Sequence, residues 1–224
     1  MRGVIAIDGP AGAGKSSTAR KVAAALGYRY LDTGALYRAL ALSVIRAGAA
    51  EEGPERMTAI ARGARVRAEW RGADEMGVFL DGEEVTRAIR DPEVTRLVSP
   101  LSAIPEVREL LIVLQREAAA AGGLVAEGRD IGTVVFPDAP LKIFLVADAR
   151  ERARRRRLEL EAAGIRKDEK EILREIEERD RRDSGRATAP LRRAPDAVVV
   201  DTTGLSLEGQ VERIVALARE AGLS

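Results

Sequence analysis

A glycine-rich segment near the start of the chain has the residue types and the spacing of a phosphate-binding loop. Its sequence, GPAGAGKS, matches the pattern G-x-x-x-x-G-K-[ST] at every position, after an apolar run and before a helical pattern. Glycine allows backbone conformations that a Cβ atom would obstruct, so that successive amide groups can point at phosphate oxygens. We therefore expect a nucleoside triphosphate to bind Gly9, Pro10, Ala11, Gly12, Ala13, Gly14, Lys15, Ser16 and Ser17.

The two residue types that end this motif would carry out different tasks. The Lys15 ammonium group would bridge the β- and γ-phosphates, and the Ser16 hydroxyl would ligate Mg²⁺. The geometry usual for this motif favours Ser16 as the metal ligand, but Ser17 could substitute for it. The alternative is a tight strand–helix turn that binds nothing, but a Lys-Ser pair has no packing reason to follow these glycines.

Residue types that the chain lacks narrow the chemistry further. The 224 residues include no His, no Cys and no Asn. The chain therefore has no imidazole base, no thiolate nucleophile and no metal site built on these ligands. Without Asn it also lacks the N-K-x-D segment with which GTPases read guanine. A net charge of +1, from 37 basic and 36 acidic residues, argues against a protein that coats nucleic acid.

A small kinase with a phosphate acceptor fits these exclusions. The second pKa of a phosphomonoester is about 6, so its attacking oxygen is already anionic at neutral pH and no general base is needed. Catalysis then depends on positioning the two nucleotides and on neutralising phosphate oxygens with Mg²⁺, Lys and Arg.

Strands that alternate with helices must position these residues. Short apolar runs predict buried parallel strands at 3–8, 124–130, 141–148 and 197–203. Helical patterns cover 15–27, 34–48, 106–121, 149–182 with a break near Gly164, and 206–221. A further helix over 55–64 is interrupted by Gly63. The alternation predicts an α/β fold, a doubly wound parallel sheet flanked by helices.

The residue pattern changes between residues 65 and 85. Its first part alternates apolar and charged residues, and Asp81-Gly82 then lies between the apolar run 78–80 and Val85, as a two-residue hairpin turn requires. We expect a small antiparallel insertion here. It could decorate the surface or contribute to a substrate site.

Six of the eight residues from 150 to 157 are arginines. A mobile lid that closes over ATP would bring such guanidinium groups to the transferred phosphoryl group. Arg152 and Arg156 are four residues apart and could share one helical face, so we expect these two to be catalytic. The alternatives are a solvated face paired with Glu159 and Glu161, or a nucleic-acid patch, which an aromatic content of 3% disfavours.

Four further segments, taken with the phosphate loop, resemble the bacterial cytidylate kinases of the nucleoside-monophosphate kinase family. The segments are LDTGALYR at 31–38, SPLSAIPEVRE at 99–109, EGRDIGTVVFP at 127–137 and RDRRDSGRATAPL at 179–191. The resemblance extends nearly end to end, and the last two segments are much more specific than the phosphate loop.

The resemblance implies one P-loop kinase domain over 1–224 and a set of acceptor-site residues. Its core would be 1–34, 109–149 and 168–224, with a monophosphate-binding insertion at about 35–108 and a short lid at about 150–167. ATP and Mg²⁺ would act on CMP or dCMP. Thr33 and Tyr37 match acceptor-site positions, and Arg38 and Arg129 match positions that hold the monophosphate; Arg129 would also be catalytic. Ser99, Arg108 and Asp130 match positions that read the base. Arg179 and Asp183 match positions near the sugar, and Arg186 matches a nucleotide contact.

The base-reading set suits cytosine chemically. The Asp130 carboxylate can accept from the exocyclic amine, whereas Arg108 and Ser99 can donate to the ring acceptors. Uracil would present an oxygen to the same carboxylate and should bind less well. Each residue also has a structural alternative: a local ion pair for Asp130 with its neighbouring arginine, a charged helix end for 179–186, a solvated Arg108, and a packed Tyr37.

Other functions remain open on the sequence alone. The chain could be another small-molecule P-loop kinase, acting on UMP, AMP, shikimate or dephospho-coenzyme A, or an ATP-binding regulatory module without phosphoryl transfer. The apolar run before Asp8 is too short for a signal peptide or a membrane span. We expect a cytoplasmic monomer whose partners are small molecules, with no nucleic acid and no membrane.

Overall fold

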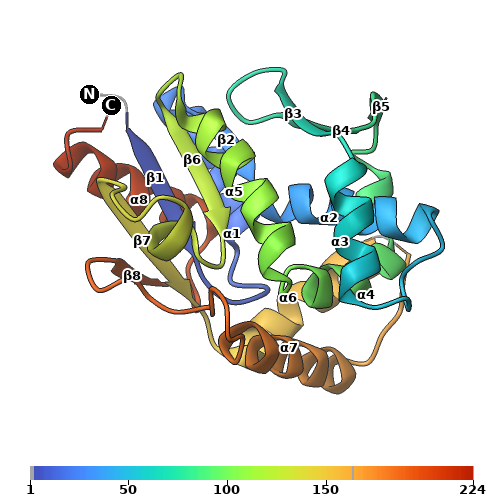
Figure 1. Cartoon of the computed structure of the whole chain (residues 1–224). Coiled ribbons are helices and arrows are strands. Elements are labelled where there is room, and N and C mark those ends of the chain that lie inside the picture. The colour runs from blue at the N-terminus through green and yellow to red at the C-terminus, as the bar shows by residue number, and fades with distance from the viewer. Residues whose placement is uncertain (1–2, 163, 224) are drawn as a thin grey trace.

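The computed structural model describes residues 3–162 and 164–223 (Figure 1). Within these residues, five parallel strands form a central sheet in the order β2-β6-β1-β7-β8. The strands are β1 (Val4–Asp8), β2 (Arg29–Asp32), β6 (Leu124–Gly128), β7 (Leu141–Val146) and β8 (Val198–Asp201). All five residues of β6 are buried, as expected for a strand whose two faces are both covered.

Helices cover both faces of this sheet. The helices of the described residues are α1 (Lys15–Leu26), α2 (Thr33–Arg46), α3 (Pro54–Gly63), α4 (Pro92–Leu101), α5 (Pro105–Ala119), α6 (Ala149–Ala162), α7 (Glu169–Ser184) and α8 (Leu207–Glu220), with a 3₁₀ turn η1 (Ala88–Arg90) and a π-helical turn η2 (Ile131–Val135). In Figure 1, α1 and α8 lie behind the sheet and α5 lies in front of it. The predicted α/β class with a parallel core is confirmed.

A second, antiparallel sheet belongs to the insertion between α3 and α4. It consists of β3 (Val66–Trp70), β4 (Met76–Leu80) and β5 (Glu83–Glu84). The predicted hairpin turn is confirmed, because Asp81 and Gly82 both have positive φ angles, 51° and 92°. The Trp70 indole N–H donates to the Tyr30 carbonyl at 2.7 Å, which ties this sheet to β2 of the core.

The observed elements differ from the predicted ones in a few places. The short strand β2 and the helix α4 were not predicted, because four residues give little periodicity and α4 contains Pro100. The predicted strands at 124–130 and 141–148 end two residues early, at Gly128 and Val146. The charged stretch 149–182 is two helices with a break at Gly164, as expected, and its residue 163 lies outside the described residues.

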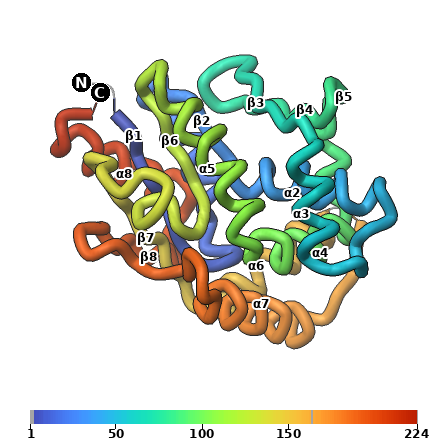
Figure 2. The backbone as a smooth tube through the Cα atoms, viewed as in Figure 1, coloured from blue at the N-terminus to red at the C-terminus, as the bar shows by residue number. Residues whose placement is uncertain are grey.

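The carboxyl ends of the parallel strands meet two further parts of the chain. Figure 2 shows α6 and α7 beside that edge of the sheet, and α4 of the insertion packs against α7. Loops that follow parallel strands at this edge are where open α/β sheets bind ligands. No helix of the described chain is long and apolar enough to cross a bilayer.

Candidate active site

The phosphate loop lies between β1 and α1 in a backbone conformation that only glycines permit. A Cβ atom on Gly9 would lie 2.3 Å from the Leu145 carbonyl oxygen, and Gly12 and Gly14 have φ angles of 75° and 89°. Gly14 is the N-cap of α1 and offers no side chain to its first N–H groups. These donors and the positive end of the helix are therefore available to an anion.

Lys15 is buried at the end of this loop. Its ammonium group donates to the Pro10 carbonyl at 2.8 Å. Burial, aided by the positive charge of Arg129, lowers the pKa of Lys15 to about 7. A phosphate placed here would restore the charged form, since an adjacent anion favours an ammonium ion.

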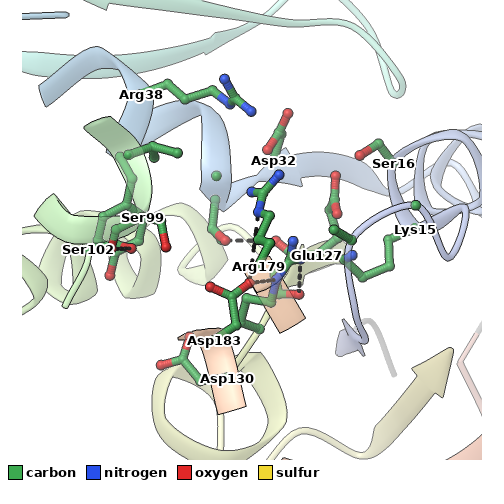
Figure 3. Close-up of a pocket in the computed structure, with 18 of the residues that line it drawn as sticks. Lys15, Ser16, Asp32, Arg38, Ser99, Ser102, Glu127, Asp130, Arg179 and Asp183 are labelled. Atoms are coloured by element: carbon green, nitrogen blue, oxygen red, sulfur yellow. Dashed lines mark hydrogen bonds and ion pairs between the residues drawn. The ribbon is translucent and has the colours of Figure 1, made fainter. Parts of the chain in front are cut away.

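A cavity of about 210 Å³, the smaller cavity, opens beside the loop at the carboxyl ends of β2 and β6. Figure 3 shows side chains from several elements converging on it. The sequence-predicted acceptor residues all line it, together with Lys15 and Ser16: Thr33, Tyr37, Arg38, Ser99, Arg108, Arg129, Asp130, Arg179, Asp183 and Arg186. The structure thus brings together these residues, which are up to 171 positions apart in the sequence, from Lys15 to Arg186.

One end of the smaller cavity holds a buried ion pair between Arg108 and Asp130. Arg108 also donates to the Ser102 carbonyl at 3.1 Å, and its guanidinium group lies 5.6 Å from the centre of the Tyr37 ring. Burial raises the pKa of Asp130 even though Arg108 opposes this shift. A buried acceptor and a buried donor side by side can read the edge of a flat polar ring, because an unmatched partner would leave one of them unpaired.

Tyr37 adds a hydroxyl group at the same end. Burial raises the pKa of Tyr37 to about 12, and among the described residues this hydroxyl has no hydrogen-bond partner in the structure. Thr33 differs, because its hydroxyl donates to the Glu127 carbonyl at 2.7 Å and fixes the start of α2 against β6.

Asp183 lies among three arginines that line the smaller cavity. Its carboxylate oxygens accept from Arg129 Nε at 2.8 Å and from Arg186 Nη2 at 2.5 Å, and Arg179 lies at 4.0 Å. Although burial alone would raise it, the neighbouring Arg129 and Arg186 hold the pKa of Asp183 below its ordinary value. One carboxylate therefore offsets part of the repulsion among three guanidinium groups.

Arg38 lies at the opposite rim in Figure 3 and is held by the insertion. Its Nη1 donates to the Thr95 hydroxyl at 2.6 Å, a residue of α4. Burial lowers the pKa of Arg38, and the nearby Arg90 adds to this effect. Such a concentration of positive charge favours a bound anion.

A larger cavity, of about 960 Å³, adjoins the first along the outside of the phosphate loop. Gly14, Ser17 and Gln210 belong only to this cavity, whereas Gly9, Pro10 and Ala13 line neither and shape the loop backbone. The residues common to both cavities are Ala11, Gly12, Lys15, Ser16, Arg38, Arg90, Ser99 and Arg179. The end of the loop is thus the boundary between two binding spaces.

The two lid arginines that we expected to act together have different surroundings. Arg156 lines the larger cavity and pairs with Glu159 at 3.0 Å. Arg152 lines neither cavity and is buried against the loop backbone, where Nη1 donates to the Ala11 carbonyl at 3.0 Å and to Asp180 at 2.5 Å. The expected pairs with acidic neighbours are present for Arg156 and for Arg157, whose partner is Glu161 at 2.6 Å.

Four residues near the cavities were not among the predicted site residues. Glu127 is buried at the end of β6 and accepts from the Tyr30 hydroxyl at 2.9 Å. Asp32 ends β2, caps α2 through Ala35 N at 2.9 Å and pairs with Arg90. Asp8 ends β1. Acidic residues at three strand ends are visible in the sequence and could have been found, but nothing in the sequence distinguishes Arg90.

The oxygen atoms around Ser16 suit a hard metal ion. Ser16, Asp32 and Glu127 all line the smaller cavity. Burial raises the pKa of Glu127, the Asp32 charge adds to this rise, and Lys15 opposes it. Hydroxyl and carboxylate oxygens are the ligands that Mg²⁺ takes alongside nucleotide phosphates, so these residues fit the ion.

The chain is similar to known proteins in sequence and in fold. A family model described as cytidylate kinase matches residues 5–220. The cytidylate kinase of Desulfitobacterium hafniense (strain Y51) is 52% identical over 213 residues, 95% of this chain and 91% of that protein. The cytidylate kinase of Pelotomaculum thermopropionicum is 51% identical over 215 residues, covering 95% and 94%. A solved gluconokinase from Sinorhizobium meliloti 1021 has a similar fold, with a TM-score of 0.50 at 17% identity over 99% of this chain and 94% of that one.

Proposed function

The chain belongs to the cytidylate kinase family, and we propose that it transfers the terminal phosphoryl group of ATP to CMP, with dCMP as a second acceptor. The observation that supports this most is the boundary between the two cavities. Lys15 and Ser16 lie on it with Ala11 and Gly12, the predicted acceptor residues all line the smaller cavity, and Gly14 and Ser17 of the phosphate loop line only the larger one. Two nucleotides bound in these spaces would meet phosphate to phosphate.

ATP would occupy the larger cavity with its phosphates on the loop. Backbone amides and the open N-terminus of α1 would hold the β- and γ-phosphates, and Lys15 would bridge them. Arg156 would reach this cavity from α6, while Arg152 would keep the loop backbone in shape through the Ala11 carbonyl. Residues at about 150–167 would act as the lid and those at about 35–108 as the insertion that holds the acceptor.

CMP would lie in the smaller cavity. The cytosine amine would donate to Asp130, and Arg108 with Ser99 would donate to the ring acceptors. Arg38 and Arg129 would hold the 5′-phosphate, while Arg179 and Asp183 would contact the sugar. Asp183 already holds Arg129 at 2.8 Å, so the phosphate-binding guanidinium group is oriented before the substrate arrives.

Phosphoryl transfer then needs positioning and charge rather than a base. A phosphate oxygen of CMP attacks the γ-phosphorus of ATP in line, the bond from that phosphorus to the bridging oxygen breaks, and ADP leaves with the electron pair. Lys15 and the arginines stabilise the equatorial oxygens during this step. Ser16, with Asp32 or Glu127 near it, would hold Mg²⁺, which would supply positive charge to the phosphates of ATP.

Initial rates of ADP formation with a panel of acceptors test the proposal. CMP should be the preferred acceptor, dCMP should be used, and UMP, AMP, shikimate and dephospho-coenzyme A should be poor. A clear preference for UMP or AMP would overturn the assignment of the base. Lys15→Met should remove activity with every acceptor, which separates turnover by this chain from a contaminating kinase.

A further inference from the structure

Asp8 is a buried acidic residue that the phosphoryl-transfer chemistry leaves without a role. It is the last residue of β1, only 4% of its surface is exposed, and it lines neither cavity. Burial raises the pKa of Asp8 to about 6, although two backbone N–H groups counteract this rise. A buried carboxylate is costly unless it is hydrogen-bonded, so the two N–H groups that donate to Asp8 show what this side chain does in the fold.

The two N–H groups belong to the first residues of η2. Ile131 N donates to Asp8 Oδ1 and Gly132 N donates to Asp8 Oδ2, each at 2.8 Å. The first N–H groups of a helical turn have no partner within the turn, and a carboxylate placed there satisfies them and interacts favourably with the helix dipole. Asp8, the last residue of β1, therefore caps η2, which lies elsewhere in the sequence.

An aspartate at the N-cap normally caps its own helix in this protein. Asp32 does so for α2, Asp91 for α4 and Asp168 for α7. Asp130 occupies the same position at η2, but its side chain makes no capping bond and pairs with Arg108 instead. The cap supplied by Asp8 thus leaves the Asp130 carboxylate free to face the cavity.

Asp8 is itself fixed to the phosphate loop. The next residue is Gly9, whose backbone packs so closely on Leu145 that no Cβ would fit. In the sheet, Asp8 pairs with Gly128, the residue before Arg129. Its carboxylate also experiences the charges of both Lys15 and Asp130. One side chain therefore connects the start of the loop for ATP with the segment that carries the acceptor residues.

We propose that Asp8 is a positioning residue that fixes Arg129 and Asp130 relative to the phosphate loop, and thereby supports recognition of the acceptor phosphate and base. This inference rests on the proposed function, because it assigns the recognition of CMP to that segment. It predicts that loss of the carboxylate affects the acceptor more than ATP.

The variant Asp8→Asn tests this directly. Asparagine keeps one acceptor oxygen but turns an NH₂ group toward one of the two N–H groups. We expect the KM for CMP to rise about tenfold or more, the preference for CMP over UMP to fall, and the KM for ATP to change less than about twofold. Asp168→Asn is the matched control, since Asp168 accepts from Lys170 N and Glu171 N and lines neither cavity. It should leave both KM values unchanged.

Hydrogen exchange supplies a readout that does not depend on the acceptor. The amide hydrogens of Ile131 and Gly132 should exchange at least about tenfold faster in Asp8→Asn. Unchanged exchange would overturn the inference, as would equal rises in both KM values. If wild-type enzyme ignores CMP, the proposed function fails, while exchange still tests the cap itself.

A second variant covers the case in which Asp8→Asn does not fold. Gly132→Ala places a methyl group 3.4 Å from Asp8 Oδ2 and 3.2 Å from the flexible Lys142 side chain, with no positive φ angle to forbid it. The same shift in the KM for CMP, smaller in size, supports the inference. Faster exchange at Ile131 and Gly132 together with an unchanged KM for CMP contradicts it.

Discussion

The guanidinium group of Arg90 is held by Asp32 at 2.9 Å, on the boundary that the two cavities share. Asp32 uses its other oxygen to cap α2, so the end of β2 fixes both the acceptor helix and this arginine. Half of the Arg90 side chain is exposed, at 52%, which leaves donors free for a phosphate. The sequence did not single this residue out.

Arg90 should therefore contribute to turnover. We expect Arg90→Ala to lower kcat/KM for CMP by about tenfold to a hundredfold, because a charge-assisted hydrogen bond to phosphate is lost. Arg87→Ala is the control, since Arg87 is exposed in the same segment and lines neither cavity. Equal rates for the two variants would remove Arg90 from the site.

Asp130 should determine the choice of base. In Asp130→Asn the amide can donate where the carboxylate accepted, so kcat/KM for CMP should fall about a hundredfold. The ratio of kcat/KM for CMP to kcat/KM for UMP should also become smaller. The variant also leaves the buried Arg108 without its ion pair, which should cost about 3 kcal/mol in the free energy of unfolding. Kinetics with both monophosphates and urea unfolding separate the two effects. If the ratio of kcat/KM for CMP to kcat/KM for UMP stays constant, other residues select the base.

Asp183 should link stability to acidity. Its pKa is lower in the folded chain than the ordinary 3.8, so its ionised form stabilises the fold above that pH, and the contribution is lost as the pH falls below it. We expect Asp183→Asn to lower the free energy of unfolding by about 3 kcal/mol at neutral pH, and this difference from wild type to shrink in acid. Glu208→Gln, which removes the exposed partner of the exposed Lys21, should show no such loss.

Lys15 should take up a proton when a nucleotide binds. Its pKa of about 7 lies below the ordinary 10.5, so at about pH 8 most of the free enzyme has a neutral amine, and bound phosphates should restore the charge. Calorimetric titration with a non-hydrolysable ATP analogue, in buffers of different ionisation enthalpy, should give uptake of nearly one proton at that pH and almost none at about pH 6. Lys15→Met should abolish the uptake; uptake that persists would place the proton on another group.

The elements with a strong local pattern could be predicted from the sequence. The phosphate loop is one such case, because G-x-x-x-x-G-K-[ST] between an apolar run and a helical pattern has few other uses. The hairpin at Asp81-Gly82 is another, since its turn type demands these residues. The predicted acceptor residues were found through their resemblance to a family, and they all line one cavity.

What escaped prediction depends on tertiary contacts. Strand β2 is held by its neighbour β6 rather than by its own four residues. Arg152 and Arg156 share a helical stretch, yet only the packing of α6 on the loop and on α7 decides that one is buried and the other faces the cavity. Asp8 looks like the end of any strand until the residues across the sheet are placed beside it.

The shared wall between the two cavities has a consequence for inhibitor design. Because the loop residues Lys15 and Ser16 border both spaces, a single compound in which a chain of phosphates joins cytidine to adenosine could fill both at once. Its second half would bind as an intramolecular event, at an effective concentration of the order of millimolar for a short linker. Such a compound should bind far more tightly than either nucleotide alone. The number of phosphates in the linker that binds best would measure the distance between the two bound nucleotides.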